Sequence, residues 1–384
     1  MPKVSSTAGI LFFLLLWAAT ASGQQKPRAR DLGVPFDGET GALNAITDVK
    51  GVEVGHTTLI SDEGSKPGSL PVRTGVTAIL PRGKASRDAV FAGWFNLNGN
   101  GEMTGTHWVE DSGFLDGPVM ITNTHSVGVV RDAVIQWKVK RGDADMEGFW
   151  WSLPVVAETR DGYLNDINGF HVTAGDAMHA LDSAHGGRVE EGNVGGGTGM
   201  ICNEFKGGIG TASRRLNPKD GPYTVGVLVQ CNYGEREQLR VAGINIGREI
   251  QGPRIWSEDT GSIIVVVATD APLIPTQLKR VARRVALGLG RDGSYSGDGS
   301  GDLFIAFSTA NPGAIQPKAL HQITMMPNDQ MDPLFLATVQ GTEEAVVNAM
   351  IAAETMTGIH GHKVMALPHD QLRTVLKKYN RLAE

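Results

Sequence analysis

The sequence predicts a mixed α/β protein built in layers, and three observations support this fold class. Three strand-like runs are apolar on both faces, which implies that other layers cover the sheet above and below. Five further segments have the apolar spacing of helices. The glycine-rich stretches between them lack the spacing of a doubly wound nucleotide-binding fold. We therefore expect α and β elements mixed in a layered sandwich.

Short strands are expected in two parts of the chain. Between Ile46 and Leu80, β-rich runs alternate with Gly, Asp and Pro, which is typical of strands and hairpins. The strands predicted there are Val52–Leu59 and Val76–Leu80. The runs that are apolar on both faces are Tyr223–Cys231, Ile263–Thr269 and Leu303–Ser308.

Helical spacing recurs between and after these strands. The predicted helices are Val130–Arg141, Thr173–Ala184, Thr276–Leu289, Thr342–Met356 and Asp370–Tyr379. Thr342 is expected to cap the fourth helix, with Glu343 and Glu344 facing the positive end of its dipole.

Length and charge limit the classes of function. The 384 residues are enough for one large domain or two ordinary ones, and the 50 glycines indicate many tight turns. No block of basic residues is present, and the formal net charge is −6. The balance of charge argues against nucleic acid as a partner.

The first residues have the pattern of an export signal. Lys3 precedes an apolar run, Gly9–Ala18, and small residues follow at Ala19, Ala21 and Gly23. The apolar run is too short to span a membrane permanently. We expect residues 1–23 to be a signal peptide and the mature protein to be secreted or periplasmic.

The two cysteines, Cys202 and Cys231, lie in strand-like runs. In an oxidising compartment such a pair can form a disulfide between neighbouring antiparallel strands. Two buried free thiols that act as small apolar side chains fit the sequence equally well. The sequence leaves both alternatives open.

Two motifs are better explained by structure than by a ligand. The run Gly195–Gly199 lacks the lysine and the spacing of a phosphate-binding loop, so a tight structural loop is expected. His360 and His362 lack an evident third ligand, so no metal site is expected there. The loop Gly99–Gly105, in contrast, can contribute backbone amide donors to a pocket.

In the middle of the chain, Thr260, Gly261 and Ser262 meet the apolar run Ile263–Ala268. Gly261 has no side chain, so its carbonyl can be approached closely. Attack by the Ser262 hydroxyl, an N-to-O acyl shift and hydrolysis leave Ser262 with a free α-amine that can activate its own hydroxyl. An α-amine has an ordinary pKa of about 8, so part of it is neutral at physiological pH. A Gly-Ser turn that enters a strand is the plain alternative.

A set of segments spread in order over nearly the whole mature chain resembles one family. These runs are NAITDVKGVEVGHTTL from Asn44, GNGEMTG from Gly99, NTHSVG from Asn123, GGGTGMIC from Gly195, FKGGIGTASR from Phe205, VGVLVQCNYG from Val225, GSIIVVVATDAPL from Gly261 and GSGDLFIAFSTAN from Gly299. The family is the L-aminopeptidase/D-esterase group of self-cleaving serine peptidases, which includes the β-aminopeptidases.

The resemblance implies one catalytic domain that is cut between Gly261 and Ser262. The products are a longer chain, residues 24–261, and a shorter chain, residues 262–384, that stay together. The implied fold is a four-layer αββα sandwich related to that of the ornithine acetyltransferase group. The implied assembly is a homotetramer.

The resemblance also assigns catalytic roles. Ser262 is the implied nucleophile for self-cleavage and for substrate turnover. Ser300 and Asp302 match positions that hold the new α-amine and the nucleophile in place, and a nearby carboxylate raises the pKa of such an amine. Asn232 matches the residue that donates to the oxyanion. Without the resemblance, Asn232, Ser300 and Asp302 would be interpreted as turn residues beside strands.

Two further positions are implied to bind substrate. Glu158 matches a carboxylate that grips the free amine of the substrate, and Trp151 is expected to form an apolar wall. Arg160 stands where the family pattern has an aromatic residue, and Tyr163 is the candidate to replace that residue. The plain alternative for Glu158 is a surface residue at the end of a strand.

The expected function is an exported, self-processing serine aminopeptidase that removes amino-terminal residues from short peptides, amides or esters through an acyl-enzyme on Ser262. Its substrates carry a free amine, and no metal or organic cofactor is expected. One alternative is an acyltransferase, although the threonine-centred motif of ornithine acetyltransferase is not found. The other is a non-catalytic exported binding protein of the same fold. The sequence does not decide between L-α, D-α and β-amino acid substrates.

Overall fold

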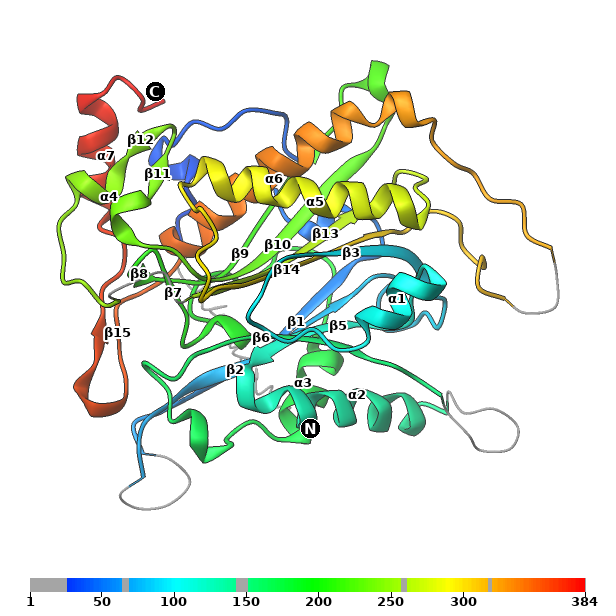
Figure 1. Ribbon diagram of the computed structural model, residues 1–384, viewed down its shortest axis with the longest axis horizontal. Helices are drawn as coiled ribbons and strands as arrows, with labels where there is room; N and C mark the ends of the chain where they lie inside the picture. Colours follow the sequence, from blue (N-terminus) through cyan, green and yellow to red (C-terminus); the bar gives the residue numbers. More distant parts are fainter. Residues whose placement is uncertain (1–25, 64–68, 143–150, 257–260, 317–319, 384) are drawn as a thin grey trace, which may run out of the picture.

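The structure, a computed structural model, describes residues 26–63, 69–142, 151–256, 261–316 and 320–383. Two β-sheets lie face to face in the middle of the molecule, and helices cover their outer surfaces (Figure 1). The expected four-layer αββα sandwich is therefore confirmed. The expected export signal and Thr260 lie outside the described residues.

The larger sheet has six strands in the order β4-β3-β14-β13-β10-β9. Its strands are β3 (Val90–Gly99), β4 (Phe114–Leu115), β9 (Gly208–Arg215), β10 (Thr224–Asn232), β13 (Ser262–Thr269) and β14 (Gly301–Ser308). β13 and β14 are parallel, whereas β10 is antiparallel to β13. The first residues of β13 and β14 therefore lie beside the last residue of β10, at the same end of the strands.

The smaller sheet has four strands in the order β1-β2-β5-β6. Its strands are β1 (Glu53–Ser61), β2 (Val72–Leu80), β5 (Val119–Asn123) and β6 (Val155–Thr159). Three two-stranded hairpins lie outside both sheets: β7 (Ile201–Cys202) with β8 (Phe205–Lys206), β11 (Arg240–Val241) with β12 (Ile244–Asn245), and β15 (Met356–Thr357) with β16 (Lys363–Val364).

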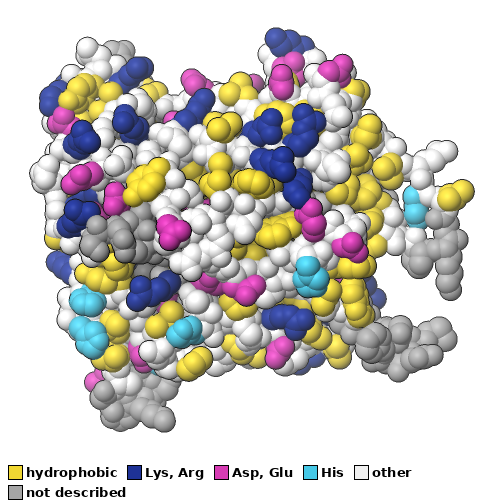
Figure 2. All heavy atoms as spheres, in the orientation of Figure 1, with side chains coloured by type: hydrophobic (Ala, Val, Ile, Leu, Met, Phe, Trp, Pro, Cys, Tyr) yellow, Lys and Arg dark blue, Asp and Glu magenta, His cyan; other side chains and the backbone are white. Residues whose placement is uncertain are grey.

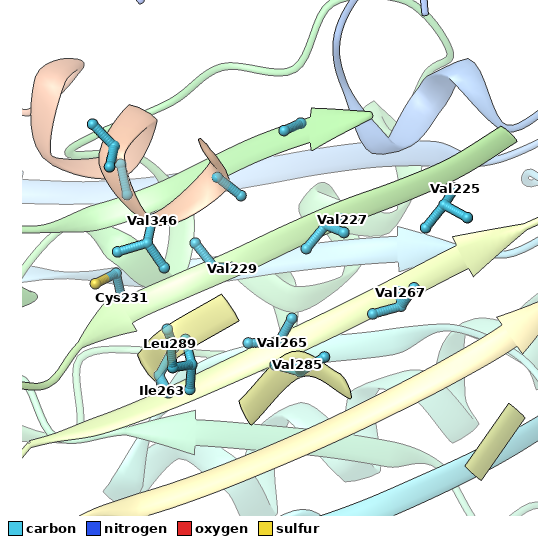
Figure 3. Close-up of a cluster of buried hydrophobic side chains, with 14 of the residues drawn as sticks. Val225, Val227, Val229, Cys231, Ile263, Val265, Val267, Val285, Leu289 and Val346 are labelled. Carbon is cyan, nitrogen blue, oxygen red and sulfur yellow. The ribbon is translucent and has the colours of Figure 1, made fainter. Parts of the chain in front are cut away.

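The strands predicted to be apolar on both faces are buried on both faces. Val265 and Val267 of β13 point towards the helices, together with neighbours from β10, α5 and α6 (Figure 3). Ile264 and Val266 of the same strand point to the other side and pack against the smaller sheet. A strand whose alternate side chains meet two different layers must be apolar throughout. The sequence pattern of β13 is therefore explained by its central place in the sandwich.

The α-helices of the described residues are α1 (Thr106–Ser112), α2 (Val127–Lys140), α3 (Ala174–Ser183), α4 (Ile246–Glu249), α5 (Pro275–Arg291), α6 (Asp332–Ile351) and α7 (His369–Lys378). α5 and α6 pack on the larger sheet, and α2 and α3 on the smaller one. The predicted helices near α2, α3, α5 and α7 are confirmed to within three residues. No helix in the described segments is both long and apolar enough to span a bilayer.

Helix α5 shows why its pattern was readable. It buries Val281 and Val285 against the larger sheet, while its basic residues face outwards and form a group over the helix in Figure 2. Arg284 lies over the Phe335 ring, with its guanidinium carbon 3.8 Å from the ring centre. One apolar face and one charged face give the periodicity of a surface helix.

The prediction for helix α6, Thr342–Met356, was wrong at its start and at its end, since Met356 lies in β15. The helix begins at Asp332, ten residues before Thr342, and ends at Ile351. Thr342 is no cap: its hydroxyl donates to the Thr338 carbonyl at 2.8 Å inside the helix. Glu344 is fully buried and forms an ion pair with Arg214 at 2.7 Å. α6 is buried on most sides, so its first half lacks the polar face that marks a surface helix.

The glycine-rich run Gly195–Gly199 is a tight structural loop, as expected. Its 3₁₀ turn, Gly195–Gly197, is fully buried. A Cβ atom at Gly196 would lie 2.2 Å from the Gln230 side-chain oxygen, and one at Gly197 would lie 2.4 Å from the Ile209 nitrogen. Only glycine fits contacts this close.

The two cysteines form a disulfide. Cys202 of β7 and Cys231 of β10 are bonded, their Cα atoms are 5.5 Å apart, and both residues are fully buried. The structure therefore decides between the two alternatives that the sequence left open.

Candidate active site

Three neighbouring strands, β10, β13 and β14, bring most of the predicted catalytic residues to the same end of the larger sheet. Ser262 is the first residue of β13, and its register partners are Asn232 at the end of β10 and Gly301 at the start of β14. Ser300 and Asp302 flank Gly301 in the sequence. Segments that lie far apart in the chain thus meet, because β13 pairs with the parallel strand β14 on one side and with the antiparallel strand β10 on the other.

The Ser262 hydroxyl oxygen lies beside the peptide bond that precedes it. The Gly301 N–H donates to Ser262 Oγ at 3.1 Å and also approaches the Gly261 carbonyl oxygen at 3.3 Å. Ser262 is buried, with 8% of its surface exposed. One backbone donor is therefore shared by the nucleophile and by the carbonyl of the expected cleavage site, which it polarises.

Gly261 occupies a place that admits no side chain. A Cβ atom there would lie 2.2 Å from the Asn232 carbonyl oxygen and 2.3 Å from the Tyr233 Cα. Both contacts are with backbone, which cannot move aside as a flexible side chain can. The glycine before Ser262 is thus required by the close approach of β10.

The Asn232 side chain is held at both ends of its amide. Its oxygen accepts from the Ile201 N–H at 2.8 Å, and its nitrogen donates to the Arg160 carbonyl at 3.0 Å. A donor on one side and an acceptor on the other fix which end of the amide is nitrogen. Each amide nitrogen carries two hydrogens, and Arg160 takes one of them.

The residues around Gly301 form a buried group in which two serine hydroxyls donate to one carboxylate. Ser300 Oγ donates to Asp302 Oδ1 at 2.7 Å, and Ser296 Oγ donates to the other carboxylate oxygen. Ser300 and Asp302 are both fully buried. The loop Asn100–Gly101 covers this segment, since a Cβ atom at Gly301 would lie 2.3 Å from the Asn100 carbonyl oxygen.

Glu158 reaches the same region from the smaller sheet. It lies near the end of β6, is 4% exposed, and accepts from the Glu102 N–H at 2.9 Å and from the Thr124 hydroxyl. Burial raises the pKa of Glu158 above its usual value, and the bonds from Thr124 and Glu102 partly offset this rise. The loop Gly99–Gly105 contributes a backbone donor here, as the sequence analysis proposed.

Gly101 lies near both the Glu158 carboxylate and Gly301, which pairs with Ser262. A Cβ atom at Gly101 would lie 3.4 Å from Glu158 Oε1 and 3.3 Å from the Gly301 Cα. The carboxylate and the Gly301 backbone thus both lie close to one small residue. The structure therefore brings together Ser262, Asn232, Ser300, Asp302 and Glu158.

Trp151 packs against helix α1. It precedes β6 by four residues, its side chain is 47% exposed, and its ring packs edge-on against Trp108 of α1 with the ring centres 5.3 Å apart. Its expected role as a wall of the substrate pocket stays a prediction. Arg160 takes part through its backbone carbonyl, which sequence reasoning about its side chain did not anticipate.

Tyr163, the candidate for the missing aromatic residue, belongs to an aromatic cluster. Its ring stacks on His362 at 4.3 Å between ring centres and meets Trp256 edge-on at 5.1 Å. His362 is thus a packing residue in the structure. In the part of the chain that the structure describes, His, Cys, Asp and Glu side chains form no group of three that could hold a metal.

Comparison with known proteins agrees with this geometry. The profile of peptidase family S58 matches residues 44–364. The chain belongs to this family. It is 56% identical to the β-peptidyl aminopeptidase of Sphingosinicella microcystinivorans, with 96% of each chain covered.

Solved structures give the same result. The L-aminopeptidase D-Ala-esterase/amidase of Ochrobactrum anthropi, described as a prototype of the serine aminopeptidases with a variant of the Ntn-hydrolase fold, superposes with a TM-score of 0.88. It is 52% identical, with 93% of this chain and 100% of that chain covered. A β-aminopeptidase from Burkholderia sp. has a TM-score of 0.85 at 46% identity, with coverages of 92% and 99%. This member of family S58 is a serine-nucleophile aminopeptidase with an Ntn-hydrolase-like αββα fold.

Proposed function

We propose that this protein cuts its own chain between Gly261 and Ser262 and then uses Ser262 to remove amino-terminal residues from short peptides, amides or esters. The observation that carries the proposal is the Gly301 N–H, which Ser262 Oγ and the Gly261 carbonyl oxygen share. Residues 24–261 and 262–384 are then two chains of one catalytic domain.

Self-cleavage begins with attack of Ser262 Oγ on the Gly261 carbonyl carbon. The Gly301 N–H stabilises the negative charge that develops on the carbonyl oxygen. The C–N bond breaks, an ester forms at Oγ, and the hydroxyl proton ends on the Ser262 nitrogen. Water then hydrolyses the ester, which leaves a carboxylate on Gly261 and a free α-amine on Ser262.

Turnover of substrate uses the same nucleophile. The neutral α-amine takes the hydroxyl proton as Oγ attacks the substrate carbonyl, and the Asn232 amide donates to the oxyanion. The buried Ser300 and Asp302 lie beside Ser262 and orient its α-amine. The leaving group takes a proton and departs, and water then releases the acyl group from Ser262.

Glu158 gives the preference for a free amino terminus. A buried carboxylate binds a substrate ammonium group more strongly than an exposed one does, because water competes less. Gly101 lies close to both the Glu158 carboxylate and the Gly301 backbone, which supports binding of the substrate amine near Ser262. Because relatives include β-peptidyl aminopeptidases and an L-aminopeptidase D-Ala-esterase, we would screen β-peptides first, with L-α and D-α derivatives as the comparison.

The test is the intact mass of the purified protein under denaturing conditions, beside a Ser262→Ala variant. The proposal expects fragments 24–261 and 262–384 from the parent and one uncut chain from the variant. An uncut, folded parent that hydrolyses no amine-bearing substrate would overturn the proposal. The control variant Ser257→Ala lies near the cut but carries no proposed role, and it is expected to be cut normally.

We also propose that the protein is exported to the periplasm or the medium. The pattern of residues 1–23 supports this, as does the buried Cys202–Cys231 disulfide, because such bonds persist in oxidising compartments. Fractionation of cells, with sequencing of the amino terminus of the exported protein, tests the proposal. A chain that stays in the cytosol with its first residues intact would contradict it.

A homotetramer is proposed on two grounds, the family pattern and an apolar arm. Between β14 and α6, the described residues 309–316 and 320–331 extend away from the body of the molecule (Figure 1). Its exposed apolar residues are Ile315, Leu320, Ile323 and Met325. Exposed apolar groups of this kind mark contact surfaces between proteins. Light scattering on the purified enzyme measures the number of chains, and a monomer would contradict the proposal.

A further inference from the structure

The Cys202–Cys231 disulfide lies directly beside the proposed oxyanion donor. Cys231 precedes Asn232 in β10, and Cys202 follows Ile201, whose N–H donates to Asn232 Oδ1 at 2.8 Å. On the other side of Cys202, the Asn203 N–H donates to the Tyr233 carbonyl at 2.7 Å. The disulfide and these two hydrogen bonds thus join the same two segments.

The segment that carries Ile201 has little regular structure of its own. β7 and β8 are two-residue strands that pair only with each other, outside both main sheets. The turn between them places Asn203 and Glu204 in the left-handed region, at φ 48° and 59°. Residues other than glycine adopt this conformation only when their surroundings hold them in it.

Other anchors hold the neighbours of this segment. The buried Lys206 ammonium group donates to the Met200 carbonyl at 2.7 Å and to the Gly207 carbonyl at 2.8 Å. The Met200 carbonyl and the Ile201 N–H belong to one peptide, so Lys206 holds the carbonyl end of the peptide that faces Asn232. The disulfide adds a covalent bond between the two segments, because Cys202 follows Ile201 and Cys231 precedes Asn232.

We propose that the Cys202–Cys231 disulfide is a positioning element of the oxyanion site, which keeps the Ile201 N–H on Asn232 Oδ1 and thereby aims the Asn232 amide hydrogens. The Ile201 N–H fixes Asn232 Oδ1, and the Arg160 carbonyl accepts one of the two amide hydrogens of Asn232. The direction of the second amide hydrogen is then fixed, because the amide group is planar. Loss of the cross-link allows the amide to rotate. This inference rests on the proposed function of Asn232.

A mispositioned oxyanion donor weakens transition-state binding more than substrate binding. We therefore expect the disulfide to affect kcat, with little effect on KM. Complete loss of one such donor lowers kcat by roughly 100- to 1000-fold. Loss of its alignment alone is expected to lower kcat by about tenfold.

The experiment compares the full-length parent with a Cys202→Ala/Cys231→Ala double variant. The chain has two cysteines, so thiol titration in denaturant first shows whether the parent is disulfide-bonded. The proposal expects a kcat about tenfold lower and a KM within about twofold of the parent. The matched control is Val134→Ala, a buried change in α2 on the far side of the smaller sheet, which is expected to lower stability but not kcat.

A cycle with Asn232→Ala separates positioning from general stability. If the disulfide acts through Asn232, its removal has no additional effect on kcat in the Asn232→Ala background. Equal slowing in both backgrounds overturns the proposal, as does an unchanged kcat in the folded double variant. If the double variant does not fold, mature parent is partly reduced and alkylated, and the fraction of intact disulfide is compared with the fraction of kcat retained. A parent that is neither cut nor active refutes the proposed function instead.

Discussion

At the scale of single residues, backbone groups do as much in this site as side chains. Ser262 meets the Gly301 N–H, and Asn232 meets the Ile201 N–H and the Arg160 carbonyl. The motif residues Ser262, Asn232, Ser300, Asp302 and Glu158 were predictable because the family resemblance marks them. The backbone partners were not, because every residue carries the same backbone groups and only the strand register selects them.

Gly261 gives a first prediction at this scale. Gly261→Ala places a methyl group 2.2 Å from the Asn232 carbonyl oxygen, so the peptide before Ser262 must shift away from β10 and the Gly301 N–H. We expect self-cleavage to be slowed strongly, by at least about tenfold, because reacting atoms tolerate little displacement. Mass spectrometry over time measures the rate. In Gly128→Ala, where a Cβ meets nothing within 4 Å, cleavage should be unaffected, and normal cleavage of Gly261→Ala would refute the argument.

Asp161 gives a prediction about pH. This buried carboxyl accepts from Asn123 at 3.0 Å, and burial raises its pKa from 3.8 to about 6. Below pH 3.8 it is protonated in the folded and unfolded states alike. As the pH rises towards 6, the unfolded chain ionises first, so the free energy of unfolding falls by about 3 kcal/mol and stays lower above that range.

Asp161→Asn should remove this part of the pH dependence. Urea unfolding at several pH values between about 4 and 7 measures it. The exposed Asp329→Asn is the control and should keep the slope of the parent. An equal slope in the parent and in Asp161→Asn would show that another group causes the change.

At the scale of secondary-structure elements, the sequence predicted best those helices and strands whose pattern of apolar residues reflects a single kind of environment. The amphipathic α5 and the doubly apolar β13 were both placed within three residues, because each has a single type of environment. Helix α6 was misplaced because it is buried against the sheet, α5 and the amino-terminal segment at once. Thr342 looked like a cap, although it fills a close contact between two helices.

This contact predicts opposite effects for two glycines of α5. A Cβ atom at Gly288 would lie 2.6 Å from the Thr342 Cβ, whereas one at Gly290 meets nothing within 4 Å. Gly288→Ala should lower the free energy of unfolding by about 1–3 kcal/mol, because α5 and α6 must separate. Gly290→Ala should raise it by up to about 1 kcal/mol through helix propensity. Denaturant unfolding of both variants decides, and an equal effect of the two changes would refute the close packing.

At the scale of the whole molecule, the proposed cut lies inside a sheet that both products share. β13 and β14 belong to residues 262–384, whereas β3 and β4 on one side and β9 and β10 on the other belong to residues 24–261. The two strands of the shorter chain thus have no free edge. The order of this sheet could not be read from the strand patterns, because pairing between distant segments leaves no local signal.

This arrangement predicts a difference in refolding. After complete unfolding in guanidinium, the uncut Ser262→Ala chain should recover native structure in higher yield than the cut parent, because separate fragments expose unpaired strand edges and must find each other. The recovery of the cut parent should also depend on concentration. Circular dichroism and size-exclusion chromatography measure both. Assembly of whole subunits is common to both proteins, so equal yields would contradict the prediction.

The shared Gly301 N–H has a consequence for timing. It reaches Ser262 and the Gly261 carbonyl only when β13 and β14 are paired in the native register, and a slip of one residue would point it away from β13. Under the proposed self-cleavage, a nascent or misfolded chain therefore does not bring together the groups that cut it. Only a correctly folded chain would then become an active hydrolase.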